Sequence, residues 1–147
     1  MDQVEIKFVN RSDNPIPEYA TEGAAGMDVR AWIPEQITLK PMERMLIPTG
    51  IFLEIPNGYE VQVRPRSGLA IHHGITCLNT PGTVDSDYRG EIKIILINLS
   101  SQAHTINSGD RIAQMVVAKV ERAFLNPVLQ LEATQRGEGG FGHTGNI

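Results

Sequence analysis

The run 79–98 holds the residues whose types and spacing are best suited to chemistry, because two acids, a tyrosine and an arginine fall within one short turn. Asp85 and Asp87 are two positions apart, and either carboxylate could act as a general base that takes a proton from water. The residue pattern alone leaves both open. A Pro-Gly pair bends the chain before the acids and an apolar strand, 91–98, follows them, so we expect a β-hairpin with the acids at its mouth.

A second candidate is the basic turn Arg64–Ala70, in which Arg66 stands beside Ser67 and Gly68. Its structural interpretation is a strand end followed by a short helix with Ser67 as the N-cap. The same geometry can bind phosphate, because the first turn of a helix presents free N–H groups and a guanidinium lies next to them. The residues alone favour neither interpretation.

The last 14 residues, Thr134–Ile147, contain five of the 14 glycines and are predicted to form an arm. They include the spacing Gly-x-Gly-x-x-Gly, but no helix follows it inside a βαβ unit, so we do not interpret it as a dinucleotide site. Composition alone favours disorder. The functional alternative is a lid, in which Arg136 pairs with phosphate and Phe141 stacks on a base.

Two further segments each carry a polar side chain among small or apolar residues. Asp28 lies in the small-residue turn Ala24–Val29 and is expected to be exposed. Gln114 is placed on the same strand face as Ile112 and Val116. A buried amide needs a partner, and this partner is either a structural carbonyl or a network of phosphate and water.

Taken in chain order, these segments resemble the five signature motifs of the trimeric dUTPase family, the deoxyuridine triphosphate nucleotidohydrolases. The resemblance implies the family's reaction, the hydrolysis of dUTP to dUMP and pyrophosphate, which keeps uracil out of DNA and supplies dUMP for thymidylate synthesis. It covers residues 24–145, and its five segments are 24–29, 65–70, 82–91, 109–116 and 136–145.

The resemblance also implies a mechanism. It selects Asp85, rather than Asp87, as the base whose activated water attacks the α phosphorus of the substrate. The implied cofactor is Mg²⁺, with no direct protein ligand: triphosphate oxygens and waters hold the ion, and Asp28 lies near those waters.

Substrate recognition follows from the same resemblance. Backbone groups of the hairpin, together with the Asn79 amide, which can both donate and accept, meet the uracil edge. Tyr88 packs on the sugar where a 2′-hydroxyl would clash, Phe141 lies over the uracil and Arg136 holds the terminal phosphate. The substrate-binding residues that the resemblance implies are Arg66, Ser67, Gly68, Asn79, Thr83, Val84, Tyr88, Lys93, Gln114, Arg136 and Phe141.

Short extended elements must position these residues. Nine prolines interrupt the chain so often that no interval before residue 90 can hold a long interior helix. We expect an all-β, jelly-roll-like sandwich or barrel over residues 1–133, followed by the flexible arm 134–147. Residues 51–55 and 59–64 are predicted to pair as a hairpin, and 67–73 is the one plausible helical turn.

The strand 91–98 is apolar on both faces, which is unusual in a small antiparallel sheet. The second apolar face indicates that copies of the chain associate. The alternative is an inner strand covered by the chain's own loops. The resemblance implies a homotrimer in which each active site combines residues from three chains.

Composition excludes other classes of protein. The net charge of −4 argues against a nucleic-acid-binding surface but allows a small charged ligand. One cysteine, Cys77, permits no internal disulfide and is expected to be a small buried residue. No apolar stretch approaches the roughly 18 residues of a membrane span, and no leader precedes the first strand, so we expect a cytoplasmic protein without membrane contact.

Two alternatives to a dUTPase remain open at this point. The dCTP deaminase family shares the fold, but its chains are typically longer and lack the Asp-Tyr-Arg-Gly form at residues 87–90. A jelly-roll binding module that uses the arm on a protein partner is the non-enzyme alternative.

Overall fold

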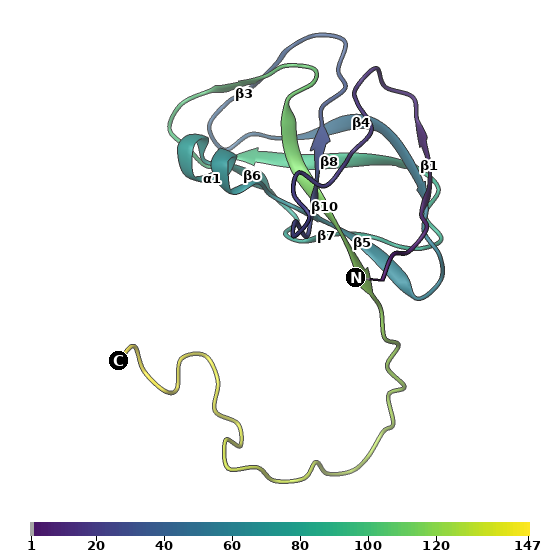
Figure 1. Cartoon of the computed structure of the whole chain (residues 1–147). Helices are drawn as coiled ribbons and strands as arrows, with labels where there is room; N and C mark the ends of the chain where they lie inside the picture. The colour runs from purple at the N-terminus through teal and green to yellow at the C-terminus, as the bar shows by residue number, and fades with distance from the viewer. Residues whose placement is uncertain (1) are drawn as a thin grey trace.

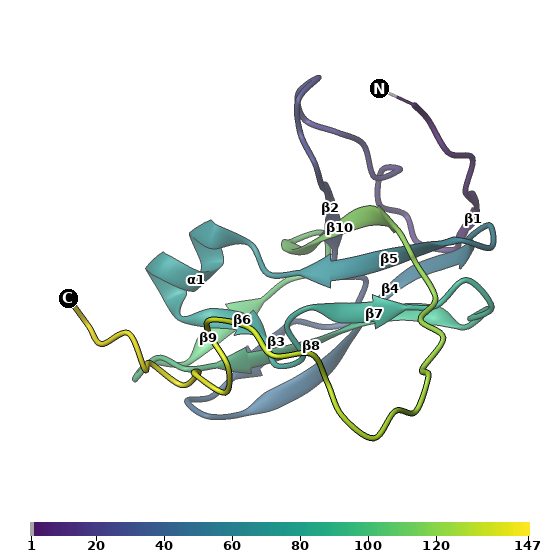
Figure 2. The same ribbon diagram turned by 90° about the horizontal axis from the view of Figure 1, so that it is seen from below.

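The computed structural model describes residues 2–147, and its strands form a two-layer, jelly-roll-like sandwich (Figures 1 and 2). One sheet has the order β1-β4-β8-β6, with bounds Lys7–Asn10, Arg44–Glu54, Glu91–Asn98 and Ile75–Cys77. The other has the order β2-β10-β5-β7, with bounds Met27–Arg30, Arg111–Lys119, Tyr59–Arg64 and Gly82–Val84. A small third sheet pairs β3 (Ile37–Leu39) with β9 (His104–Ile106), and α1 spans Ser67–His73. The expected all-β fold is confirmed.

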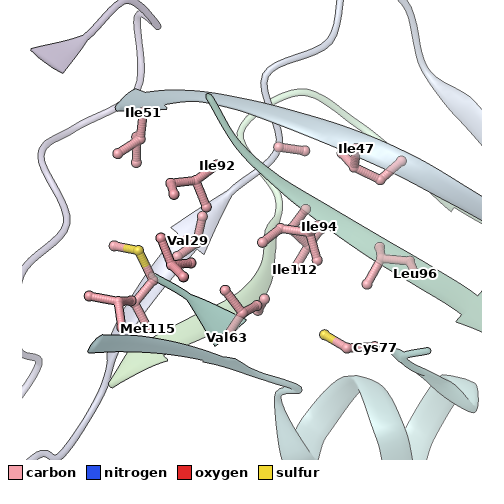
Figure 3. Close-up of a cluster of buried hydrophobic side chains, with 14 of the residues drawn as sticks. Val29, Ile47, Ile51, Val63, Cys77, Ile92, Ile94, Leu96, Ile112 and Met115 are labelled. Carbon is pink, nitrogen blue, oxygen red and sulfur yellow. The ribbon is translucent and has the colours of Figure 1, made fainter. Parts of the chain in front are cut away.

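The core lies between the two large sheets, as Figure 3 shows. Alternating residues of each strand point inward, so β4 and β8 meet β2, β5 and β10 through apolar side chains. Burying one such side chain stabilises the fold by about 1.5–3 kcal/mol. The facing residues include Ile47, Ile92, Ile94 and Leu96 on one side and Val29, Val63, Ile112 and Met115 on the other.

A fully buried asparagine closes one end of β8. The Asn98 side-chain amide donates to the carbonyls of Leu39 and Gln102, both at 2.8 Å. Its oxygen accepts from the backbone N–H and the hydroxyl of Ser100. Because every polar atom of the side chain has a partner, its burial costs little and fixes β8 against β3.

Both predicted hairpins are wrong, and for the same reason. Residues 51–55 lie in β4 or just after it, whereas 59–64 form β5 in the opposite sheet. Likewise β7 pairs with β5, whereas β8 pairs with β4 and β6. Turn residues end a strand, but contacts distant in sequence decide its partner. The acids after β7 therefore lie on a crossover between the sheets.

A bulge changes the predicted faces of β10. Its register with β2 shifts between Arg111 and Ala113, so both Ile112 and Ala113 are buried in the core. Gln114 and Val116 do share a face, and both side chains approach Gly26. The placement of Ile112 on that face was wrong.

β8 is an inner strand of its sheet, with β4 on one side and β6 on the other. Ile97 is 8% exposed and is covered by its own chain. At this residue the alternative holds, in which the chain itself covers the second apolar face of the strand. Ile95 remains half-buried, and its register partner Leu46 is exposed. Part of the second apolar face of this sheet therefore remains exposed in one copy of the chain.

The chain after β10 runs away from the sandwich (Figure 1). Residues 120–147 contain no helix or strand, and almost all of their side chains are exposed. Regular structure thus ends at Lys119, and the boundary at residue 133 stays a prediction. Within residues 2–147, no helix has the length and apolar character needed to cross a bilayer.

Candidate active site

Asp28 organises a cluster of charged groups at the edge of the β2-β10-β5 sheet. Its carboxylate accepts from Nε of Arg66 at 3.0 Å and from a terminal nitrogen of Arg111 at 3.3 Å. Arg66 also donates to the backbone carbonyl of Arg111 at 3.2 Å. These contacts occupy two of the five N–H groups of Arg66 and fix its plane. We call Asp28, Arg66 and Arg111 the arginine cluster.

The helix that follows, α1, spans the predicted turn 67–73 but has a different N-cap. Arg66 is the residue before its first turn, with φ −96° and ψ 130°, and makes no side-chain cap. Ser67 is therefore the first helical residue, and its prediction as N-cap was wrong, because Arg66 still has an extended backbone. Ser67 and Gly68 are both exposed beside the arginine cluster.

Gln114 lies between the two neighbouring strands at this edge of the sheet. It lies opposite Asp28 on one side and opposite Arg64 on the other, because β10 pairs with both β2 and β5. Its amide donates to the carbonyl of Pro65 at 3.1 Å, so a structural carbonyl satisfies that N–H. A Cβ on Gly26 would collide with the Gln114 side-chain oxygen. Gly26 in the first motif therefore leaves room for the Gln114 amide of the fourth motif, and this amide holds Pro65, the residue before Arg66.

The acids lie in a second group, the turn 85–90. The N–H of Tyr88 donates to the carbonyl of Asp85 at 3.2 Å, and Arg89 donates to the carbonyl of Ser86 at 2.7 Å. The Tyr88 hydroxyl donates to the carbonyl of Glu91 at 2.8 Å. Asp85 follows β7 directly, which anchors it at the base of the turn. Both acids are exposed, so geometry leaves each accessible to a ligand.

The remaining residues predicted around this turn differ in whether their side chains are accessible to a ligand. Asn79 folds against Gly82, whose Cβ would lie 3.2 Å from its amide nitrogen. Thr83 and Lys93 are exposed, on β7 and β8 respectively. Val84 is 7% exposed and belongs to the core, so only its backbone can face a ligand.

The arm carries the third group. Arg136 donates from Nε to the carbonyl of Gly139 at 2.7 Å, which curls the glycine-rich turn. Phe141 has φ 52° and a fully exposed ring. Within residues 2–147, no hydrogen bond or ion pair joins the arm, the turn 85–90 and the arginine cluster. One copy of the chain therefore holds the predicted residues in three separate places.

Other titratable groups lie apart from these. The rings of His73 and His104 are 4.5 Å apart between centroids. Burial lowers the pKa of His104, the nearby His73 lowers it further, and Asp110 opposes the shift. Burial raises the pKa of the Cys77 thiol to about 11, as expected for a small buried residue.

The dUTPase family model matches residues 12–145. The chain is 59% identical to the deoxyuridine 5′-triphosphate nucleotidohydrolase of Fusobacterium nucleatum, over 99% of both chains. The chain belongs to the dUTPase family. The nucleotidohydrolase of Finegoldia magna is 57% identical, over 97% of this chain and 99% of that one. The chain is accordingly a hydrolase that acts on dUTP, and the family predicted from its motifs is confirmed.

Solved structures agree on the fold. The dUTPase of Staphylococcus bacteriophage 80alpha with dUpNHpp matches with a TM-score of 0.82 at 24% identity, over 97% of this chain and 99% of that one. A dUTPase variant from phage phi11 of S. aureus, described with a structural Mg(II) ion, matches with a TM-score of 0.78 at 22% identity, over 88% of this chain and all of that one. A dUTPase-like β fold is thus retained at low identity.

Two parts of this site were missed from sequence. Arg111 was not singled out, although it shares Asp28 with Arg66. Gly26 was noted only as part of a small-residue turn. The signal for both was their position inside a motif, but their role depends on contacts between strands that the motif does not show.

Proposed function

We propose that the chain cleaves dUTP to dUMP and pyrophosphate through a water that Asp85 activates for attack on the α phosphorus. The observation that carries this assignment is the anchored position of Asp85 at the end of β7, where its carbonyl closes the turn with Tyr88. Asp87 lies at the tip of the same turn, where less of the backbone restrains it. A positioned carboxylate can hold and deprotonate one water. The proton passes to the Asp85 carboxylate, and pyrophosphate leaves.

The arginine cluster supports phosphate binding. Arg66 is held edge-on by Asp28, so its unused N–H groups present a fixed fork that suits phosphate oxygens. Ser67 and Gly68 are exposed beside it. These residues grip the α and β phosphates, and Gln114 keeps the chain before Arg66 in place. Arg136 of the arm holds the terminal phosphate.

Recognition of the base and sugar belongs to the crossover 79–93. Asn79, Thr83 and the backbone of Val84 line a slot for the uracil edge, with Lys93 at its border. Tyr88 packs on the sugar, and Phe141 covers the base. An amide beside fixed backbone groups supplies both donors and acceptors, which a uracil edge requires. Close packing rejects the additional methyl of thymine, although a methyl alone changes binding by only about 1–3 kcal/mol.

Magnesium fits this donor set through water and substrate oxygens. Within residues 2–147, no three His, Cys, Asp or Glu side chains are grouped as a metal cage. Asp28 uses one oxygen on each of two guanidinium groups and keeps further lone pairs for water. When bound, Mg²⁺ would offset the negative charge of the triphosphate. Asp28 would orient the waters around it, and no protein atom would ligate the ion directly.

Three copies of the chain complete the site in this proposal. Within one copy the three groups of residues lie apart, and the segment after β10 exposes apolar side chains that water solvates poorly. They include Phe124, Leu125, Leu129, Leu131 and Phe141. We expect light scattering to give three times the chain mass of 16.2 kDa. A monomeric mass would overturn the shared site.

In the cell, this activity would keep uracil out of DNA and supply dUMP for thymidylate synthesis, and we place the enzyme in the cytoplasm. Neither nucleic acid nor membrane is a proposed partner.

The decisive assay measures pyrophosphate release from dUTP, dCTP, dTTP and UTP, with and without Mg²⁺. The expected result is release from dUTP far faster than from the other three nucleotides, with loss of activity when EDTA removes the metal. Ammonia release from dCTP would indicate a deaminase instead. Absence of any reaction, in a correctly assembled protein, would favour the binding module.

A further inference from the structure

Gly90 lacks the usual backbone reason to be glycine. Its φ is outside the left-handed range that strains other residues, unlike that of Gly58 or Gly109. What excludes a side chain at this position is the ring of Tyr88. A Cβ built on Gly90 would collide with the Tyr88 hydroxyl oxygen, and would lie 2.5 Å from Cζ and 2.8 Å from Cε1.

The ring of Tyr88 is therefore folded over the bare backbone of Gly90. Its hydroxyl donates to the carbonyl of Glu91 at 2.8 Å, on the far side of that glycine. Its own N–H donates to Asp85. The residue is thus held at both ends, yet 45% of it remains exposed, which leaves surface of the ring available to a ligand.

We propose that Gly90 is a positioning residue that sets the selectivity for deoxyribose over ribose, by allowing the Tyr88 ring to lie flat against the turn. This inference rests on the proposed contact between Tyr88 and the sugar. A ring excludes a 2′-hydroxyl only if it cannot yield, and the hydrogen bond to Glu91 provides that restraint when nothing lies beneath the ring.

Replacing Gly90 by alanine should displace the Tyr88 ring. Carbon atoms prefer separations of about 3.5–4.0 Å, so the ring must move by roughly 1 Å to accommodate a Cβ. The ring is the far end of a flexible side chain, so this shift disturbs the fold little but stretches the bond to Glu91. A displacement of about 1 Å is sufficient to change the rate of an enzyme reaction substantially.

The test compares kcat/KM for dUTP and for UTP in Gly90→Ala. The expected result is a fall of at least about tenfold in the dUTP/UTP ratio, with an unchanged oligomer and a similar thermal midpoint. Gly23→Ala is the matched control, because a Cβ there meets nothing within 4 Å and its φ is also ordinary. An unchanged ratio in Gly90→Ala would overturn the inference.

A double variant shows whether Gly90 acts through the ring. In a Tyr88→Ala background, Gly90→Ala is expected to leave the ratio where Tyr88→Ala alone puts it. A further fall would assign Gly90 a different role. If Gly90→Ala does not fold, the double variant should fold, since the clash is with the ring; failure of both would also overturn the inference. Absence of dUTP hydrolysis in the unmodified protein would refute the proposed function instead.

Discussion

Two acidic residues two positions apart, Asp85 and Asp87, differ in how firmly their backbone is held. Asp85 continues from β7 and shares its carbonyl with the N–H of Tyr88, whereas Asp87 lies at the tip of the turn. A general base must keep one orientation toward its water, because a small displacement lowers the rate steeply. Anchorage therefore favours Asp85, in agreement with the family motif.

Replacing Asp85 by Asn should lower kcat for dUTP by at least about a hundredfold, because the amide cannot take the proton from water. Oligomeric mass and affinity for dUpNHpp are expected to remain near those of the unmodified protein. Asp87→Asn is the matched control and should retain most of the activity. Near-normal turnover in Asp85→Asn, or a larger loss in Asp87→Asn, would reverse the assignment.

At the scale of single residues, motif positions supplied the candidate site residues but not the residues that support them. Asp28, Arg66 and Gln114 were selected from sequence, and the structure brings them to one sheet edge. Arg111 and Gly90 were not selected, since their importance depends on a shared carboxylate and on a ring lying overhead. Such relations become visible only when strands are paired.

Among the secondary-structure elements, α1 and β9 meet through two histidines. His73 lies in the last turn of α1, and its ring contacts that of His104 in β9. Arg30, Arg66 and Arg111 line the same cavity as His104, and Asp110 is the acid beside it. Burial and the neighbouring His73 lower the pKa of His104 and favour its neutral form, whereas Asp110 opposes the shift.

The stability of the fold should therefore fall as the solution is acidified. Because the pKa of His104 is lowered in the folded state, the unfolded chain binds more protons between the folded value and the usual value of about 6.5. Its contribution to stability is complete above that usual value and declines below it. The thermal midpoint should drop less between pH 7.5 and pH 5.5 in His104→Asn than in the unmodified protein. An equal drop in both would contradict this origin.

The arm is the second element with a testable role. Ending the chain after Arg136 removes Phe141 and the glycine-rich turn while leaving both sheets intact. The truncated protein should stay folded and oligomeric but lose most of its dUTP hydrolysis, because nothing closes over the base. Phe141→Ala separates the ring from the rest of the arm and should raise KM more than it lowers kcat. Full activity after truncation would indicate that the arm is a disordered tail that the reaction does not need.

Element types followed from local patterns, whereas their pairing did not. Proline spacing and alternation predicted short strands and the one helical turn at 67–73. The two predicted hairpins were wrong because each turn passes from one sheet to the other. The residues near each turn do not determine which sheet the next strand joins, because that depends on the burial of β4, β5 and β8 against distant strands.

On the scale of the whole molecule, the fold of one chain keeps the three groups of candidate site residues apart, whereas the proposed reaction needs them together. The arginine cluster, proposed to bind phosphate, lies at one sheet edge. The crossover proposed to bind the base links the two sheets, and the arm extends away from both (Figure 1). The fold itself is retained in phage dUTPases at 22–24% identity, so the scaffold tolerates wide changes in sequence. Assembly of copies is the proposed way in which these parts meet.

The most direct test is a crystal structure of the full-length protein with dUpNHpp and Mg²⁺. The expected result places uracil against residues 79–93 of one copy, with Asp85 beside the water nearest the α phosphorus. The triphosphate should then contact Arg66 of a second copy, and Phe141 of a third should cover the base. Uracil bound away from the crossover, or an α phosphorus out of reach of Asp85, would contradict the account.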